Sequence, residues 1–317
     1  MRNRIILVLF VSTFTLCIAP LFGAIALNFS EIWSDSKTQS IFFSLRIPRV
    51  VLGFVVGGGL ALCGLCFQAI LKNPLAEPYT LGVASGSALG AAIFIHFGWS
   101  FSFLFMSGLT ISSMTGALVT MAVLFSQNRV SRYPFKLLLF GIIINFFCGS
   151  VMSLLQALGS MSDNFRLGRW MMGSLESASA SAMWLIAPIV FILSVLIWGL
   201  SPRLNMLATG TDIAKSRGVN IITTLRLFYS LVGLMIGFMV AFCGPIGFIG
   251  LIIPHFTRLL FGTDHKLLCP IAFLLGGCLL VLADTAARTL FSPAEIPVGI
   301  ITALIGAPFF AWVLSRR

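Results

Sequence analysis

The sequence predicts an all-α, polytopic membrane protein whose 317 residues form a single transmembrane domain. Only 9% of the residues are charged and 58% are hydrophobic, whereas soluble proteins carry about 25% charged residues. The mean hydropathy is +1.05, and apolar stretches of about 18 residues or more recur along the whole chain. A soluble core cannot account for so few charges, so these stretches are predicted to be transmembrane helices.

The first predicted span lies near residues 5–27 and follows Arg2 and Arg4. Its apolar run is longer than the roughly 7–15 residues of a signal peptide and has no clean cleavage site, so we expect an uncleaved helix. Nine further spans are predicted near residues 48–70, 79–97, 103–125, 136–158, 181–199, 224–243, 246–262, 269–290 and 297–314. The chain is therefore expected to cross the membrane about ten times.

The distribution of basic residues predicts the orientation of these spans. With the N-terminus inside, more than two thirds of the 20 Lys and Arg residues fall on the cytoplasmic side, as the positive-inside rule requires. Both termini are therefore predicted to be cytoplasmic. The net charge of +11 forms no basic patch with interleaved aromatics, so no nucleic-acid partner is expected. The basic residues left on the outer side are Lys37, Arg46, Arg49, Arg166, Arg169 and Arg288.

Small residues at intervals of four mark several spans. Gly53-x3-Gly57 and Gly82-x3-Gly86-x3-Gly90 let helix backbones approach closely, either inside one bundle or across a dimer. Spans five apart run in opposite directions, and the second and seventh spans share one pattern. This match is either chance in a glycine-rich chain or the mark of an inverted repeat. The matched segments are Gly57-x3-Ala61-x-Cys63-Gly64 and Gly237-x3-Ala241-x-Cys243-Gly244.

The sequence predicts no catalytic centre, metal site or resident cofactor. It contains no Gly-Lys dipeptide, which excludes a Walker A motif, so energy from ATP has to come from another subunit. The three histidines, His96, His255 and His265, are too dispersed to suggest a metal site. Cys63 and Cys66 have the spacing of a redox motif but no nearby His or acidic partner, which favours helix packing. We therefore expect no enzymatic activity in this chain.

The segment Asn73-Pro74-Leu75-Ala76-Glu77-Pro78 interrupts the apolar pattern between the second and third spans. Each proline lacks a backbone N–H and tends to break a helix. A bilayer tolerates such backbone only where it is buried in protein or faces water. The segment is therefore either an ordinary turn on the cytoplasmic side or part of a lined pathway.

The loop at about 200–223 is the longest one predicted on the cytoplasmic side. Thr211 is expected to cap a short helix that runs through Arg217 and ends at Gly218. Two short amphipathic helices joined at Gly210 would suit a docking surface for a soluble partner. The alternative is an interfacial loop.

Charged residues on the outer side offer two further candidates. Pro48 in Arg46-Ile47-Pro48-Arg49 fits the first turn of the second span. The two arginines either reach lipid phosphates or recognise carboxylates on a partner. Asp284 and Arg288 are spaced i,i+4 in the ninth span. They either pair on one helix face or leave Asp284 as a proton-coupling site.

Taken in order along the chain, a set of motifs resembles the FecCD-type permease subunits of binding-protein-dependent ABC importers, which take up iron-siderophores, haem and cobalamin. The resemblance implies one permease domain over residues 1–317, with ten helices in which helices 2–5 and 7–10 form an inverted repeat. The motifs are Arg46-Ile47-Pro48-Arg49, Gln68 to Gly82, Trp170 to Ser174, Leu204 to Gly218, Gly244 to Leu251 with Pro254-His255, Ala283-Asp284, Ala294 to Gly299 and Gly306-Ala307-Pro308.

The resemblance also implies partners. Two permease copies line a central pathway, with a homodimer expected, and a dimer of cytoplasmic ABC ATPases docks beneath them. A periplasmic or lipid-anchored substrate-binding protein delivers the cargo, and membrane lipid surrounds the helices. ATP and Mg²⁺ are used by the partner ATPase, so no cofactor is expected on this chain.

Particular residues acquire roles by the same resemblance. Arg46, Arg49 and Arg288 match the arginines that meet glutamates on the two lobes of the binding protein. Asn73 and Leu75 match a cytoplasmic gate, and the loop near Arg129–Lys136 is the candidate for the other gate. The segment Leu204–Gly218 matches the coupling helices that meet the ATPase. The residues expected to carry this contact are Leu207, Ala208, Gly210, Ala214, Arg217 and Gly218.

The function expected from the resemblance is import of a metal chelate across the inner (cytoplasmic) membrane. The binding protein delivers the chelate, and ATP binding and hydrolysis move the coupling helices and gates between outward-open and inward-open states. The alternative is a proton-coupled secondary transporter that uses Asp284 or Glu295 as its proton site.

Overall fold

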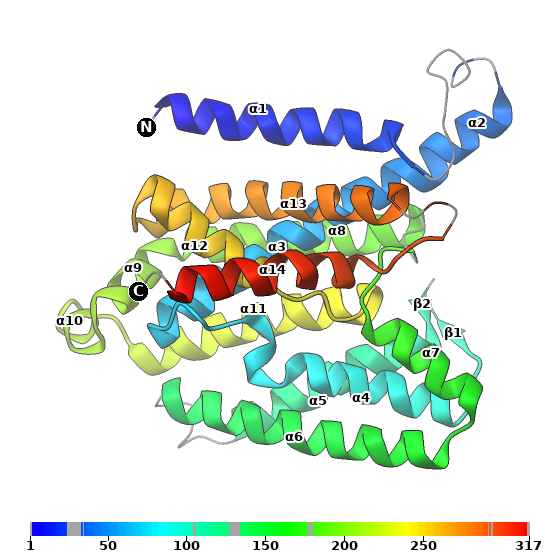
Figure 1. Cartoon of the computed structure of the whole chain (residues 1–317). Helices are drawn as coiled ribbons and strands as arrows, with labels where there is room; N and C mark the ends of the chain where they lie inside the picture. Colours follow the sequence, from blue (N-terminus) through cyan, green and yellow to red (C-terminus); the bar gives the residue numbers. More distant parts are fainter. Residues whose placement is uncertain are drawn as a thin grey trace.

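The computed structural model describes residues 2–23, 33, 35–103, 106–126, 134–176, 180–290, 292 and 294–315. The described chain is almost entirely helical, and its long helices run side by side as one bundle (Figure 1). The prediction of an all-α polytopic membrane protein is confirmed. The helices that follow the predicted spans are α1 (Arg2–Ile18), α3 (Ile47–Leu71), α4 (Val83–His96), α5 (Gly108–Ser126), α6 (Pro134–Leu158), α8 (Ala180–Gly199), α11 (Ile221–Cys243), α12 (Ile249–Phe261), α13 (His265–Thr289) and α14 (Val298–Ser315).

Within the described residues, seven helical stretches are long and apolar enough to cross a membrane, and three apolar helices are shorter. The shorter ones are α4, α12 and α14, so the set agrees with the ten predicted spans. Two predicted edges were wrong, in addition to the start of the second span, which is described below. The first helix ends at Ile18 and is followed by the 3-10 turn η1 (Ala19–Leu21), and α5 begins only at Gly108 because two short antiparallel strands precede it. These strands are β1 (Ser102–Phe103) and β2 (Met106–Ser107).

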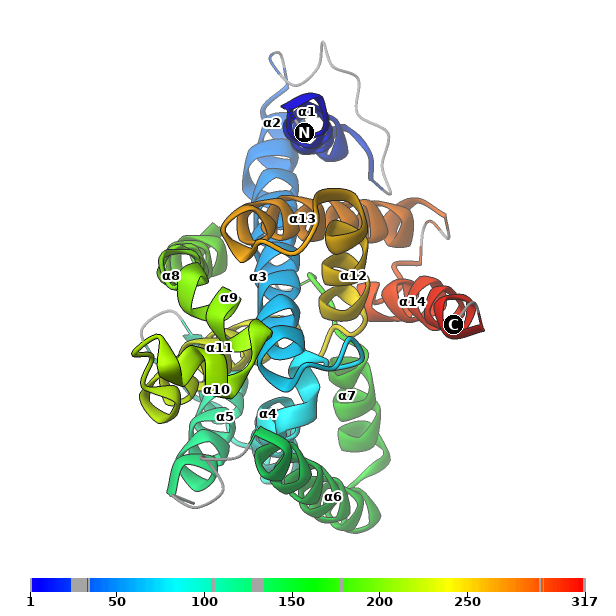
Figure 2. The ribbon, with the colours of Figure 1, turned by 90° about the vertical axis from the view of Figure 1, so that its left-hand side faces the viewer.

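Helix α3 lies at the centre of the bundle (Figure 2) and contacts α8, α11, α12 and α13. Its glycines make these close contacts possible. A Cβ added to Gly57 would lie 2.3 Å from the carbonyl oxygen of Gly276 in α13, and one added to Gly64 would lie 1.8 Å from that of Gly250 in α12. Among the alternatives left open for the small-residue pattern, packing inside one bundle accounts for these glycines.

The two halves of the bundle repeat one set of contacts. Helix α3 packs against α12 and α13, and α11, five spans later, packs against α4 and α5. Likewise α4 contacts α5 and α6, while α12 contacts α13 and α14. The matched glycines lie at equivalent crossings, since Gly57 meets α13 and Gly237 meets Ala117 of α5. This arrangement is the one that an inverted repeat of helices 2–5 and 7–10 requires.

The helix that contains the second span begins twelve residues earlier than expected. It runs without interruption through α2 (Ser36–Ser40), the π-helical stretch η2 (Ile41–Arg46) and α3. Asp35 starts it by accepting a hydrogen bond from the backbone N–H of Thr38 (3.0 Å). Pro48 lies in the first turn of α3, as predicted, but α3 continues a helical stretch that begins at Ser36. The π-helical turn directly before Pro48 widens the backbone at the point where a proline ring crowds a regular helix.

The bundle has two chemically different ends (Figure 1). We call the end with α2 and the amphipathic helix α7 (Met161–Met171) the arginine end, after Arg46, Arg49 and Arg288. We call the opposite end, which carries α9 (Ser201–Thr209), α10 (Thr211–Ser216) and the loop after α3, the hairpin end. Helix α7 was not predicted, because its polar composition resembles that of a loop.

Candidate functional site

The arginine end is organised by Arg49 in the first turn of α3. Its guanidinium group donates through Nε and Nη2 to the carboxylate of Asp284 on α13, with an Nη2–Oδ1 distance of 2.9 Å. Its Nη1 donates to Oε2 of Glu295, just before α14, at 2.8 Å. One side chain thus joins α3 to two elements that lie more than 230 residues later in the sequence.

The other two arginines are also turned into the protein. Arg288 pairs with Asp284 one turn earlier on α13 (Nε–Oδ2, 3.0 Å) and donates to the carbonyl of Phe22 at 3.3 Å. Arg46 donates to the carbonyl of Leu21 at 2.9 Å. Only 3% of Arg288 and 6% of Arg46 is exposed. The i,i+4 pairing considered from the sequence is therefore present, and Asp284 additionally holds Arg49.

The structure brings the three predicted docking arginines together, but in this conformation it does not present them to a partner. Arg49 keeps 13% of its side chain exposed and Glu295 keeps 32%, so this pair is the most accessible part of the cluster. Docking to a binding protein stays a prediction. Sequence reasoning missed the Arg49–Asp284 and Arg49–Glu295 pairs because nothing in spacing alone links residues from different spans.

At the hairpin end, the proline segment forms a tight, structured loop. Lys72 ends α3 in the left-handed conformation (φ 50°), and the side-chain Oδ1 of Asn73 accepts a hydrogen bond from the N–H of Leu75 at 2.9 Å. This Asx turn leaves the side chain of Leu75 43% exposed. Asn73 is thus a turn former and Leu75 an outward apolar residue, which fits a turn and a gate equally well.

The second half of the loop is tied to the segment between α11 and α12. The Oε1 of Glu77 accepts a hydrogen bond from the N–H of Phe248, at 2.7 Å, at the start of α12. Burial raises the pKa of this carboxyl group above its ordinary value, although the N–H of Phe248 acts in the opposite direction. The hydroxyl of Tyr79 donates to the carbonyl of Ile246 (2.6 Å) and accepts from its N–H (2.7 Å). The loop and the start of α12 therefore move together or not at all.

The predicted coupling segment forms two short helices, as expected, with a sharp corner at Gly210 (φ 149°, ψ 145°). Only glycine adopts this backbone conformation readily. Gly210 is also the N-cap of α10, so the expectation that Thr211 caps this helix was wrong. Gly218 follows α10 with φ 79°, as a helix-ending glycine does.

The two helices have a buried and an exposed side. Leu207 and Ala214 anchor them to the bundle, whereas Ala208, Ile213 and Arg217 are exposed. Such a segment is held by the membrane domain and offers a surface outward. The candidate second gate lies near Arg129–Lys136. Residues 129–133 are outside the described residues, and Lys136 lies in the first turn of α6.

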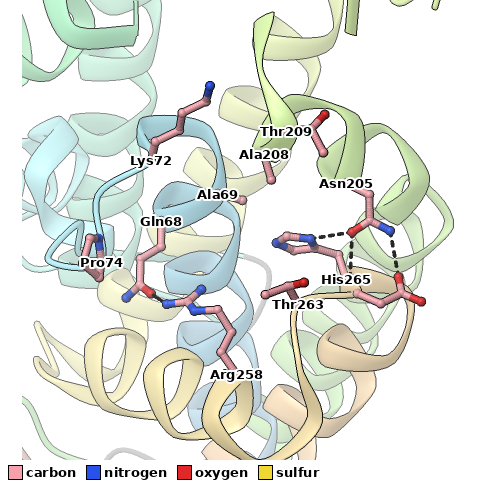
Figure 3. Close-up of a pocket in the computed structure, with 11 residues that line it drawn as sticks. Gln68, Ala69, Lys72, Pro74, Asn205, Ala208, Thr209, Arg258, Thr263 and His265 are labelled. Atoms are coloured by element: carbon pink, nitrogen blue, oxygen red, sulfur yellow. Dashed lines mark hydrogen bonds between the residues drawn. The ribbon is translucent and has the colours of Figure 1, made fainter. Parts of the chain in front are cut away.

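A pocket of about 740 Å³ opens between the coupling segment, the end of α3 and the turn from α12 to α13 (Figure 3). Its walls therefore belong to the proline loop, to α9 and to the α12–α13 turn at once. The residues that line it include Gln68, Lys72, Pro74, Asn205, Ala208, Arg258 and His265.

Asn205 on α9 connects the coupling segment to α13. Its Nδ2 donates to Oδ1 of Asp264 at 2.7 Å, which fixes the orientation of the amide. Its Oδ1 then accepts from the backbone N–H of His265 (2.8 Å) and faces Nδ1 of the same residue (2.7 Å). Because Oδ1 is an acceptor, Nδ1 of His265 carries the hydrogen and Nε2 is left with its lone pair. Among the described residues, Nε2 has no hydrogen-bond partner.

The opposite wall of the pocket carries a second polar pair. The Nη2 of Arg258 on α12 donates to Oε1 of Gln68 on α3, and Nε2 of Gln68 donates to the carbonyl of Gly250 at 3.2 Å. Sequence reasoning did not single out Arg258, Gln68 or Asn205. Gln68 and Asn205 lay near the edges of two family motifs, but their partners come from other spans.

Comparison with known proteins identifies the architecture. The model of the FecCD transport family matches residues 8–316. The hemin transport system permease protein HmuU of Yersinia pestis is 36% identical over 93% of this chain and 90% of its own length. The molybdate import system permease protein MolB of Haemophilus influenzae is 38% identical over 89% of this chain and 83% of its own length.

A solved structure shows the same fold. It is described as an inward-facing conformation of a putative metal-chelate type ABC transporter. The match covers 100% of both chains with a TM-score of 0.91 and 33% sequence identity.

Proposed function

The chain belongs to the FecCD transport family and is a multi-pass permease of the ABC-importer class, and we propose that it moves a metal chelate inward by ATP-driven alternating access. The chelate would be an iron-siderophore, haem or cobalamin. The coupling segment would receive the movement of a cytoplasmic ATPase, and the proline loop would act as the gate. In the proposed arrangement, the hairpin end faces the cytoplasm, where the ATPase binds, and the arginine end faces the binding protein on the other side of the membrane.

The observation that supports this proposal best is the physical continuity at the hairpin end. Asn205 of the coupling segment is hydrogen-bonded to His265, and both residues line the same pocket as Pro74 of the proline loop. A displacement of α9 therefore reaches α13 through two hydrogen bonds, and it reaches the gate through α3, which contacts α9 and leads into the proline loop. The exposed side of α9 and α10, with Ala208 and Arg217, supplies the surface for a dimer of ATPases, which would bind ATP and Mg²⁺.

At the arginine end, Arg49 is the residue best placed to engage a carboxylate of the binding protein. Glu295 is its most exposed partner and would compete with an incoming glutamate. We therefore expect Glu295→Gln to strengthen docking of the binding protein by up to about fivefold, the scale of one exposed ion pair. Glu176→Gln is the matched control, because Glu176 pairs with Arg169 at the same end of the bundle. Weaker or unchanged docking of the binding protein to Glu295→Gln would show that Arg49 is not part of the docking site.

The cargo is the part of the proposal that the relatives constrain least, since one is named for hemin and another for molybdate. The test is stimulation of ATP hydrolysis in the permease–ATPase complex, reconstituted with its binding protein and a panel of ferric siderophores, haem, cobalamin and molybdate. Stimulation by one chelate supports the proposal and names the cargo. Stimulation by molybdate alone would replace the metal chelate with an oxyanion.

The alternative was a carrier that exchanges protons at Asp284 or Glu295. In the structure the oxygens of Asp284 are occupied by two guanidinium groups, and Glu295 is paired with Arg49, an arrangement better suited to holding helices than to passing protons. Uptake into proteoliposomes driven by a pH gradient, without any ATPase, would reverse this preference.

A further inference from the structure

An apolar groove lies on the outer surface of the bundle and shares no lining residue with the pocket described above. It runs between α8 and α13 with α3 as its floor, three helices that contact one another (Figure 2). Its volume is about 240 Å³. The side chains that form it include Leu62, Phe191, Val195, Trp198, Pro270 and Phe273.

The polar atoms that border this groove already have partners. The hydroxyl of Ser194 donates to the carbonyl of Val190 at 2.7 Å, and Nε1 of Trp198 donates to the carbonyl of Lys266 at 2.9 Å. Cavities lined only by apolar groups stay dry and take up hydrocarbon. The groove therefore fits a hydrocarbon chain and offers no hydrogen bond to orient a polar metabolite.

The length of the groove matches part of one membrane leaflet. From Trp198 to Phe191 the helix advances seven residues, or about 10 Å, and half of a bilayer's hydrocarbon core is about 15 Å thick. Trp198 stands at the end nearest α9, and tryptophan is enriched where the hydrocarbon core meets the headgroups. The groove thus starts at the headgroup level and runs toward the middle of the membrane.

A cation stands at the headgroup end of the groove. Lys266 is exposed and lies four and seven residues before Pro270 and Phe273, which places all three on one face of α13. Its neighbour Asp264 carries the opposite charge, but the carboxylate of Asp264 is occupied by Asn205 and by the N–H of Lys266. Basic residues at such positions attract the headgroups of anionic lipids.

We propose that this groove is a binding site for an anionic phospholipid. One acyl chain lies against Val195 and Phe273, and the headgroup phosphate lies beside Lys266. By the orientation proposed above, the lipid belongs to the cytoplasmic leaflet. Lipid bound here would brace α8 against α13 next to the coupling segment.

The site can be tested by native mass spectrometry of the purified permease, mixed with phosphatidylglycerol or phosphatidylcholine in detergent. We expect the wild type to retain phosphatidylglycerol preferentially. Val195→Trp should fill the groove and abolish the retention of one lipid molecule. The control Ile192→Trp places the same side chain at an exposed position of α8 outside the groove and should retain the lipid.

The headgroup contact is tested separately. Lys266→Gln should reduce the preference for phosphatidylglycerol by about fivefold, the effect of one lysine near an anionic headgroup, whereas Lys37→Gln at the opposite end should not. Equal retention by Val195→Trp and the wild type would overturn the site. A change in oligomeric state in Val195→Trp without loss of lipid would overturn it too, because the occupant would then be a second copy. The assay requires no ATPase or cargo, so its failure leaves the proposed transport function untouched.

Discussion

The two ends of the bundle use charge in opposite ways. At the arginine end, Arg288 and Asp284 are buried and Arg49 is largely so, and both arginines pair with Asp284. Through its second partner, Glu295, Arg49 also joins α3 and α13 to the segment before α14. At the hairpin end, Lys72, Lys215 and Arg217 are exposed, and a pocket of about 740 Å³ separates the elements. At the arginine end, charge pairs hold the helices directly against one another. At the hairpin end, a pocket lies between the elements, and polar side chains connect them across its walls.

This difference indicates where the molecule can move at low cost. Removing one partner from a buried ion pair leaves an uncompensated charge, which is strongly unfavourable. Shifting an exposed helix such as α10 leaves its charges in water and costs little. We therefore expect the helices of the hairpin end to move when a partner binds, while the helices at the arginine end keep their positions relative to one another.

The largest effect is expected from breaking the lock. Asp284→Asn removes the carboxylate that holds both Arg49 and Arg288, and should lower the free energy of unfolding by about 3–5 kcal/mol. Denaturant unfolding in mixed micelles measures this. Glu176→Gln breaks the exposed Arg169–Glu176 pair and should cost about 1 kcal/mol or less. Equal losses in the two variants would show that the buried cluster is no lock.

A smaller effect is expected from bending the hairpin. Gly210→Ala places a side chain at φ 149°, a conformation that costs about 1–3 kcal/mol for other residues. The corner between α9 and α10 should change, so transport should fall while unfolding of the bundle stays near that of the wild type. The measurement pairs cargo uptake in proteoliposomes with an unfolding curve.

Gly199→Ala is the control for this experiment, because its Cβ would meet nothing within 4 Å and it ends the neighbouring helix α8. Alanine is favoured over glycine in helices by about 1 kcal/mol, so this variant should keep its transport. If Gly210→Ala also transports normally, the corner at Gly210 has no part in coupling.

The gate is expected to respond more weakly. Replacing Asn73 and Leu75 with alanine removes the Asx hydrogen bond, worth about 0.5–1.5 kcal/mol, and shortens the exposed apolar side chain. Glu77 and Tyr79 still fasten the loop to the start of α12, so the fold should persist. Cargo leak, or ATP hydrolysis without cargo, should rise. Wild-type levels of both would make the segment a turn and nothing more.

Much of this comparison could be predicted from the sequence, but not its contacts. Apolar length predicted the spans, and Gly210 with Gly218 predicted two short helices, because both signals are local. The partners of Arg49 come from α13 and the loop before α14, and Asn205 meets His265 across 60 residues. Side-chain pairs of this kind are set by helix packing, which local periodicity does not encode. Pro48 lies in the first turn of α3 as predicted, but the helical stretch that precedes it from Ser36 was not predicted.

The smallest effect distinguishes two carboxylates at the hairpin end by the sign of their pH dependence. Hydrogen bonds from Asn205 and the N–H of Lys266 lower the pKa of Asp264, so its contribution to stability is complete above the unfolded pKa of about 4. This contribution is lost as the pH falls through the lower pKa of the folded state.

Burial raises the pKa of Glu77, so the protein gains stability as the pH falls from neutral through that raised value. Unfolding midpoints measured between about pH 3 and 7 report both effects. Asp264→Asn should abolish the loss of stability at the acidic end of this range, and Glu77→Gln should abolish the gain in stability as the pH falls from neutral. If the two variants show identical dependence of the unfolding midpoint on pH, then Glu77, which binds the start of α12, is as exposed to solvent as Asp264, which binds α9. The contact between the proline loop and α12 would then not be buried.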